Sequence, residues 1–133
     1  MDGLFQRKNM KIKTQYKTEW RNKQGELHRT NDPAVIYESG TQCYWKNGRL
    51  HRDDGPAVIH SNGTQSYWQN GKLHRTNGPA VIHSDGTQYY FQNGKFHRED
   101  GPAIIYPDGL QEYWQNGKQL TKGKYENQNS IQN

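Results

Sequence analysis

The run from Tyr67 to Gln88, YWQNGKLHRTNGPAVIHSDGTQ, recurs along the chain and decides the fold. It returns with few changes from Tyr44 and from Tyr90, and in part from Tyr113. One aromatic row shows the 23-residue period: Trp45, Trp68, Phe91 and Trp114. An internal repeat of this length indicates one supersecondary unit stacked on copies of itself.

The composition predicts a thin molecule. A chain of 133 residues is one domain by size, yet only 29% of its residues are hydrophobic and its mean hydropathy is −1.33. Such a chain suits an elongated sheet in which each unit buries residues only against its neighbours. Large rings fill a shallow core well, and the chain has nine Tyr and four Trp.

The first turn signal of each unit predicts a hairpin. Asn62-Gly63 separates the alternating run 56–61 from the returning run 64–68, which is typical of a two-residue turn of type I′ character. A turn of that length would place Ile59 opposite Ser66. The second signal, Asn70-Gly71, predicts another two-residue turn.

These turns assign side chains to the two faces of the sheet, because opposed residues share a face. The face expected to be buried carries Ala57, Ile59, Trp68 and Leu73, with Arg75 near its edge. The amphipathic face, expected to be half exposed, carries Val58, His60, Tyr67 and His74.

Charge and pattern divide the chain into three parts. Residues 1–29 hold eight of the 18 basic residues and three of the 13 acidic ones, which leaves ten of each in the remainder. We therefore expect a basic N-terminal cap or arm over 1–19, a repeat domain over 20–118, and a C-terminal cap with a polar tail over 119–133. Atypical terminal units are what a stacked sheet needs to protect its edges.

The alternation of YW-x-NG-x-x-HR-x-x-G with an x-Gly hairpin resembles the MORN repeat family. Tyr67 and Trp68 are adjacent here, and Arg75 rather than Gly follows His74, so the likeness is to a variant of the family. The resemblance covers about Trp20 to Gly117. It implies an all-β fold, an elongated single antiparallel sheet of stacked β-hairpins with about four units plus caps. It also implies scaffolding, dimerising or headgroup-contacting roles, and similarity to repeats of bacteria, phages and large DNA viruses.

His-Arg pairs stand at 28–29, 51–52, 74–75 and 97–98. They form either a ladder of cations for phosphates or carboxylates, or a structural row. In the structural interpretation each His packs on Tyr and bonds a loop carbonyl. Each Arg then pairs with an acid such as Asp54 or Asp100, or stacks on an aromatic ring. The repetition favours the structural interpretation.

Other chemistries have weaker signals. Equivalent His residues of successive hairpins would lie about 10 Å apart, too far to share a metal ion, and we expect no metal and no cofactor. Cys43 is alone, with no base singled out beside it, and we expect no catalysis. The Tyr and Trp rows could stack nucleic-acid bases, but the neutral repeat body argues against phosphate binding.

The leading hypothesis is therefore a non-enzymatic repeat module that binds a protein partner, as a viral or phage product masking a host factor would. The alternative is a binder of an acidic ligand (nucleic acid, a nucleotide or an anionic lipid headgroup) through the His-Arg rows and the basic arm. A homodimer through the end of the rod is a further expectation. With one cysteine and no apolar run long enough to span a membrane, we expect a cytoplasmic protein, in the host cytoplasm if it is viral. The residues expected to contact the partner are His51, Arg52, Tyr67, His74, Arg75, Tyr90, His97 and Arg98.

Overall fold

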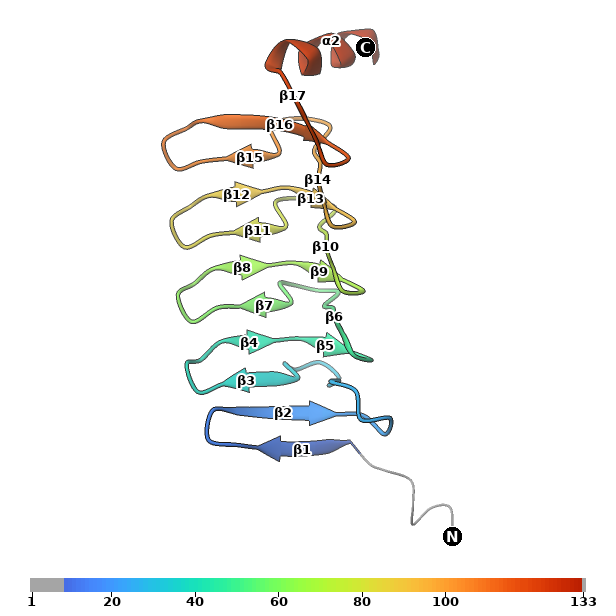
Figure 1. The fold of residues 1–133 in the computed structure, drawn as a ribbon, viewed down its shortest axis with the longest axis vertical. Coiled ribbons are helices and arrows are strands. Elements are labelled where there is room, and N and C mark those ends of the chain that lie inside the picture. Colours follow the sequence, from blue (N-terminus) through green and yellow to red (C-terminus); the bar gives the residue numbers. More distant parts are fainter. Residues whose placement is uncertain (1–8, 133) are drawn as a thin grey trace.

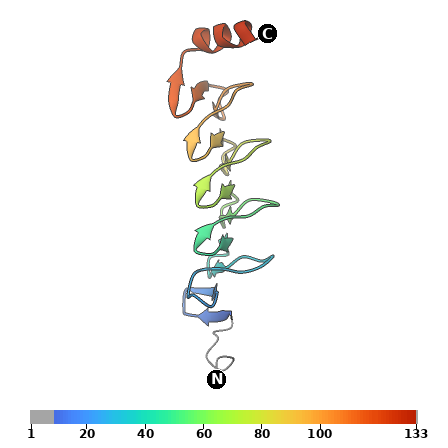
Figure 2. The same ribbon diagram turned by 90° about the vertical axis from the view of Figure 1, so that its right-hand side faces the viewer.

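A computed structural model describes residues 9–132 and shows antiparallel hairpins stacked along one axis (Figure 1). The main sheet has 11 strands and stays open, in the order β1-β2-β3-β4-β7-β8-β11-β12-β15-β16-β17. The predicted all-β fold, a long single antiparallel sheet of stacked hairpins, is confirmed. Turned by 90°, the stack is narrow, as the low hydrophobic content predicts (Figure 2).

Each unit gives one hairpin to this sheet. The strands are β1 (Met10–Lys13), β2 (Lys17–Arg21), β3 (Val35–Tyr37), β4 (Gln42–Cys43), β7 (Val58–Ile59), β8 (Gln65–Ser66), β11 (Val81–Ile82), β12 (Gln88–Tyr89), β15 (Ile104–Ile105) and β16 (Gln111–Gln115).

A second, shorter hairpin continues each unit beyond the main sheet. Its strands are β5 (Trp45–Lys46), β6 (Arg49–Leu50), β9 (Trp68–Gln69), β10 (Lys72–Leu73), β13 (Phe91–Gln92), β14 (Lys95–Phe96) and β17 (Lys118–Leu120). In the last unit β16 runs unbroken through both hairpins and pairs with β17. The two hairpins of a unit therefore extend to opposite edges of the stack (Figure 1).

The first turn is one residue longer than predicted. Ile59 lies opposite Gln65, not Ser66, and the loop spans 61–63. Of its three residues only Gly63 has a positive φ, of 94°. The Asn62 Oδ1 instead accepts a hydrogen bond from the Thr64 N–H at 2.9 Å. A three-residue loop that ends in a left-handed glycine is the next most common hairpin connection after the two-residue turn.

This extra residue overturns the predicted faces, because a one-residue slip moves every side chain of a strand to the other face. Val58 pairs with Ser66, so the Val58 row lies with Ser66 and Trp68, and the Ile59 row lies with Gln65 and Tyr67. In the next unit the His83 and Tyr89 rings meet edge to face at 5.0 Å, which places the His60 row with Trp68 rather than with Tyr67.

The second turn has the predicted register. Trp68 pairs with Leu73 and Gln69 with Lys72, and both central residues are left-handed, with φ of 49° at Asn70 and 81° at Gly71. The Asn-Gly pair thus forms a two-residue turn here and a three-residue loop at 61–63. The backbone of each unit's turn also bonds to the previous unit, since the Gly71 N–H donates to the Leu50 carbonyl at 2.8 Å.

The core is two rows of small side chains rather than the Trp face. The Trp rings are half-buried, whereas each Ala that starts a hairpin is fully buried. The buried hydrophobic residues are Ala34, Val35, Ala57, Val58, Ala80, Val81, Ala103 and Ile104. The core is shallow because each unit has only two close neighbours along the stack.

The two ends of the stack are covered differently. The β1–β2 hairpin closes the N-terminal end, and the outer strand β1 carries Lys11 and Lys13, which discourages pairing with other chains. The part of the expected basic arm over 1–8 lies outside the described residues. At the other end helix α2 (Lys122–Gln132) lies across the stack, with Tyr125 packed on Tyr113 at 4.6 Å between ring centroids (Figure 2). Over 9–132, no helix is long and apolar enough to cross a bilayer.

Candidate binding surface

The His-Arg pairs begin the loops that connect each unit to the next, over 28–33, 51–56, 74–79 and 97–102. We call them the His-Arg loops. The second, third and fourth start where β6, β10 and β14 end, and the backbone of each loop reaches the following unit. The Arg52 N–H, for example, donates to the Trp68 carbonyl at 3.2 Å. The loops therefore stand one above the other at the spacing of the repeat.

Each loop arginine lies over an aromatic ring of its own unit. The guanidinium carbon of Arg52 is 3.9 Å from the centre of the Tyr44 ring, and that of Arg75 is 3.9 Å from Tyr67. Arg98 over Tyr90, at 4.0 Å, repeats the arrangement. Stacking of this kind is a cation–π contact, which the structural interpretation of the row predicts.

The same guanidinium is held from two further sides. Nη1 of Arg75 donates to the Pro79 carbonyl at 3.1 Å. A Cβ built on Gly78 would lie 3.0 Å from the guanidinium carbon, and one on Gly101 only 2.7 Å from that of Arg98. The glycine before the proline therefore leaves room for the arginine in the second, third and fourth loops, whereas in the first loop Arg29 donates to the Pro33 carbonyl at 3.2 Å with Asp32 at that position.

Ion pairs of the arginines differ between units. Arg52 Nε binds Asp54 at 3.2 Å and Arg98 Nε binds Asp100 at 3.1 Å, as predicted. The residue equivalent to Asp54 in the third loop is Asn77, so Arg75 keeps the ring and the carbonyl without that carboxylate. The ring and the carbonyl are constant along the row, whereas the acidic partner is optional.

The histidines join neighbouring units. Nδ1 of His51 accepts a hydrogen bond from the Asn70 backbone N–H of the next turn at 3.0 Å, and His74 does the same for Asn93. The predicted bond to a loop carbonyl is wrong, because the partner is a backbone donor and the ring nitrogen must be unprotonated to accept from it. Nε2 of His51 also lies 2.8 Å from an Asp53 oxygen.

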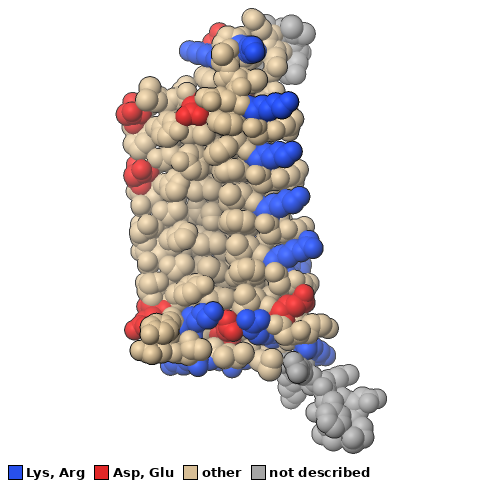
Figure 3. All heavy atoms as spheres, viewed as in Figure 1, with Lys and Arg blue, Asp and Glu red and all other residues tan. Residues whose placement is uncertain are grey.

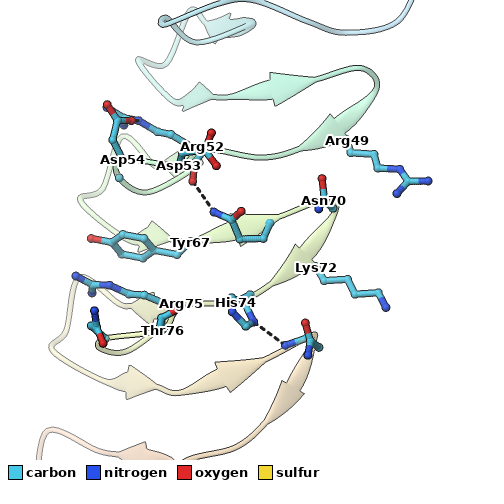
Figure 4. A pocket seen from close by; sticks show the side chains of 14 residues that line it. Arg49, Arg52, Asp53, Asp54, Tyr67, Asn70, Lys72, His74, Arg75 and Thr76 are labelled. Carbon is cyan, nitrogen blue, oxygen red and sulfur yellow. Dashed lines mark hydrogen bonds and ion pairs between the residues drawn. The ribbon is translucent and has the colours of Figure 1, made fainter.

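Three open grooves separate successive His-Arg loops. The one between the second and third loops has a volume of about 870 Å³ and is lined by Arg52, Tyr67, His74 and Arg75, among others (Figure 4). The next, of about 660 Å³, is lined by Arg75, Tyr90, His97 and Arg98, and the first, of about 470 Å³, includes His51. The eight residues expected from the sequence are therefore spread over three equivalent grooves and do not form one site.

The residues at the rims of the grooves differ between units, whereas the arginine and the aromatic ring beneath them recur in every unit. The exposed residue pairs at the tips of the loops are Thr30-Asn31, Asp53-Asp54, Thr76-Asn77 and Glu99-Asp100. The grooves consequently differ in charge, although each has an aromatic ring and an arginine beneath its tips.

A second set of cations was not predicted. The residue after each Asn-Gly turn is Arg49, Lys72, Lys95 or Lys118, and all four are exposed. We call this set the cationic column. Figure 3 shows basic side chains in a line along the edge that carries the second turns. Summing charge over whole segments conceals the column, whereas comparing one repeat position across units would have found it.

Titratable chemistry elsewhere is sparse. Burial raises the pKa of the Cys43 thiol, which lowers the fraction of the reactive thiolate. Within the described part of the chain, no three His, Cys, Asp or Glu side chains come close enough together to hold a metal ion.

A comparison with known protein families, with curated proteins and with solved structures finds no match to the chain.

Proposed function

We propose that the chain is a MORN-like, non-enzymatic repeat module whose His-Arg loop side binds a protein partner. The observation that carries the proposal is the row of three equivalent grooves, each with an arginine stacked on an aromatic ring and each with different residues at its tips. A rod of this kind suits a partner that contacts several successive grooves.

The residue types fit such an interface. Tyr and Arg are enriched among the residues that contribute most to protein–protein binding. Here the ring and the guanidinium are already fixed by Pro79 and Gly78 in the third loop, so little side-chain freedom would be lost on binding. The constant frame would supply affinity and the variable tips would supply selectivity.

The acidic-ligand alternative through the His-Arg rows has less support. Each guanidinium is stacked and bonded to a carbonyl, and three of the four also have a carboxylate partner. A phosphate would have to displace those partners. A host factor masked by a viral or phage product, a cytoplasmic location and a homodimer remain predictions, and the first of these rests on the resemblance alone.

The test begins by isolating a partner with the tagged full chain from a lysate, with and without nuclease. The decisive step is the affinity of that purified partner for Thr76→Trp, because the exposed Thr76 lines both the 870 and the 660 Å³ grooves. The matched control is Ser61→Trp, which adds the same ring at an exposed position on the opposite edge.

We expect Thr76→Trp to weaken binding about tenfold or more and Ser61→Trp to leave it unchanged, with the same circular dichroism for both. Equal affinities for the two variants would contradict binding in the grooves. A partner that is lost after nuclease treatment would contradict the protein-partner proposal.

A further inference from the structure

The cationic column has no acidic partner among residues 9–132. None of Arg49, Lys72, Lys95 and Lys118 takes part in an ion pair, whereas Arg29, Arg52 and Arg98 of the His-Arg loops all do. Two strands separate equivalent positions, so neighbouring cations of the column stand about 10 Å apart and the column spans about 30 Å. These four are four of the ten basic residues in 30–133, a segment that also holds ten acidic residues.

Packing explains the stems of these side chains but not their charge. The Cβ of Lys72 lies against Gly94 of the next turn, 3.8 Å from where a glycine Cβ would be, and Lys95 lies against Gly117 in the same way. In the first unit the equivalent place against Gly48 is taken by Glu26. Since a glutamate stem packs equally well there, the cations of the four following units are not imposed by the fold.

The column is separate from the grooves of the proposed function. Arg49 and Lys72 border the 870 Å³ groove, but their side chains point away from Arg52, Tyr67 and Arg75 (Figure 4). A ligand on the column therefore leaves the His-Arg loops free, and this inference does not depend on the groove proposal.

A line of exposed cations suits a polyanion better than isolated carboxylates. Exposed ion pairs with single carboxylates are individually weak. A nucleic-acid backbone instead releases condensed counterions when cations approach it, and this supplies affinity without any pocket. Four exposed cations in a line can approach such a backbone together.

The surroundings favour a duplex over a single strand. Proteins that bind single strands stack bases on exposed aromatic rings. The exposed large apolar side chains of the described residues are Ile12, Tyr16, Tyr37 and Leu110. Tyr37 and Leu110 flank hairpin loops at the opposite edge, Ile12 and Tyr16 lie in the first hairpin, and the Trp rings beside the column are half-buried, so the column offers no fully exposed ring for stacking. Its length of about 30 Å is close to one turn of B-DNA, about 34 Å.

We propose that the cationic column binds the phosphate backbone of duplex nucleic acid, independently of sequence, with the duplex lying along the rod. Each of the four side chains neutralises one phosphate. Bases are not read, because contacts to phosphates carry no sequence information directly.

The test is fluorescence anisotropy of a labelled random-sequence DNA duplex with the full chain over a salt series. Four phosphate contacts contribute about −3.6 to the slope of log K against log salt, equivalent to a loss of about 150-fold between 50 and 200 mM. We expect the variant R49Q/K72Q/K95Q/K118Q to lose that part of the slope and to bind about tenfold or more weakly at 50 mM salt.

The control variant, K13Q/K23Q/K122Q/K124Q, removes four exposed lysines from the two ends and changes the net charge equally. An equal loss in this control would overturn the proposal, because binding would then follow net charge alone. Absence of duplex binding at 50 mM salt would also overturn it, as would tighter binding of a single strand.

Two further outcomes separate the duplex from other partners. Poly-glutamate that binds through the column more tightly than the duplex would show that the ligand is an acidic polypeptide. The edge opposite the column carries Glu38, Asp85 and Asp108, so a second copy is the other candidate. Sedimentation of the protein alone that shows an oligomer, dissociated by the column variant, would assign the column to self-association. Either result would overturn the proposal, and a monomer would support it.

Discussion

The two rows of cations in this rod share a period and a charge, but they differ in their surroundings. Arg75 of the His-Arg loops is covered by Tyr67, bonded to the Pro79 carbonyl and crowded by Gly78. Lys72 of the cationic column contacts the next unit only through its stem and extends into solvent (Figure 4). A repeated cation is therefore structural in one row and unpaired in the other.

The difference shows how repetition should be interpreted. A residue that recurs in every unit serves either the joint between units or a surface that needs the period. Only the contacts of the charged group separate these roles. The loop arginines stabilise the joint between units. The column serves a surface, since Glu26 replaces its cation in the first unit without loss of packing.

Neutralising the loop arginines should have the largest effect. In R52Q/R75Q/R98Q each site loses a cation–π contact and a charge-assisted bond to a carbonyl, together about 1–2 kcal/mol for a partly exposed group. The three sites are about 10 Å apart and should add to about 3–6 kcal/mol in the free energy of unfolding. Urea denaturation of this variant beside R49Q/K72Q/K95Q/K118Q measures the contrast.

The column variant should change the free energy of unfolding by less than about 1 kcal/mol, because exposed substitutions away from special features have small effects. Equal destabilisation of the two variants would break the distinction between the rows. Should the triple variant fail to fold, the single variant Arg75→Gln tests the same contacts.

An intermediate effect is expected for Gly101→Ala. The new Cβ would lie 2.7 Å from the guanidinium carbon of Arg98, so Arg98 must shift on Tyr90, at a cost of at most about 1–2 kcal/mol, the value for complete loss of its contacts. Thermal unfolding measures this cost. The control is Gly123→Ala, where a Cβ meets nothing within 4 Å and the helix gains propensity.

A double-mutant cycle isolates the contact. In an Arg98→Gln background the alanine at 101 should cost clearly less, because the crowded group is gone. Additive losses would show that Gly101 acts independently of the arginine.

The smallest change in stability is expected for Glu26→Lys, which extends the column to the first unit. Its free energy of unfolding should change by about 0.5 kcal/mol or less, even though Glu26 accepts a bond from Asn22 Nδ2 at 3.0 Å. The salt slope of duplex binding should become steeper by about 0.9. An unchanged slope with an intact fold would indicate that the column does not act as a row.

The architecture was predictable from the sequence because the period is strict and glycines mark the turns of each unit. The strand register was not, because Asn-Gly has two structural meanings here. Asn70 takes the left-handed conformation itself, whereas Asn62 uses its side chain to accept a hydrogen bond and leaves the left-handed position to Gly63. Asp85 accepts the same bond from the Thr87 N–H at 2.8 Å, so Asp-Gly forms the same three-residue loop in the next unit.

The surfaces were predictable only in part. Recurrence identified the His-Arg loops, and residue type anticipated the stacking of Arg52 and its pairing with Asp54. Their grooves depend on the spacing of loops in space, which the sequence does not show. The column was missed because its charges cancel against acids such as Asp85 and Asp108 elsewhere in the repeat body.

The bond from each histidine to the next turn makes every joint in the rod alike. At four successive joints the ring nitrogen accepts the same backbone donor at 3.0 Å. Adding a repeat unit would therefore lengthen the rod by about 10 Å, the spacing of two strands. Duplicating 23 codons would add one repeat unit with its own groove and its own column cation, and the existing units would keep their structure. The length of the rod and the number of its binding positions would then increase together.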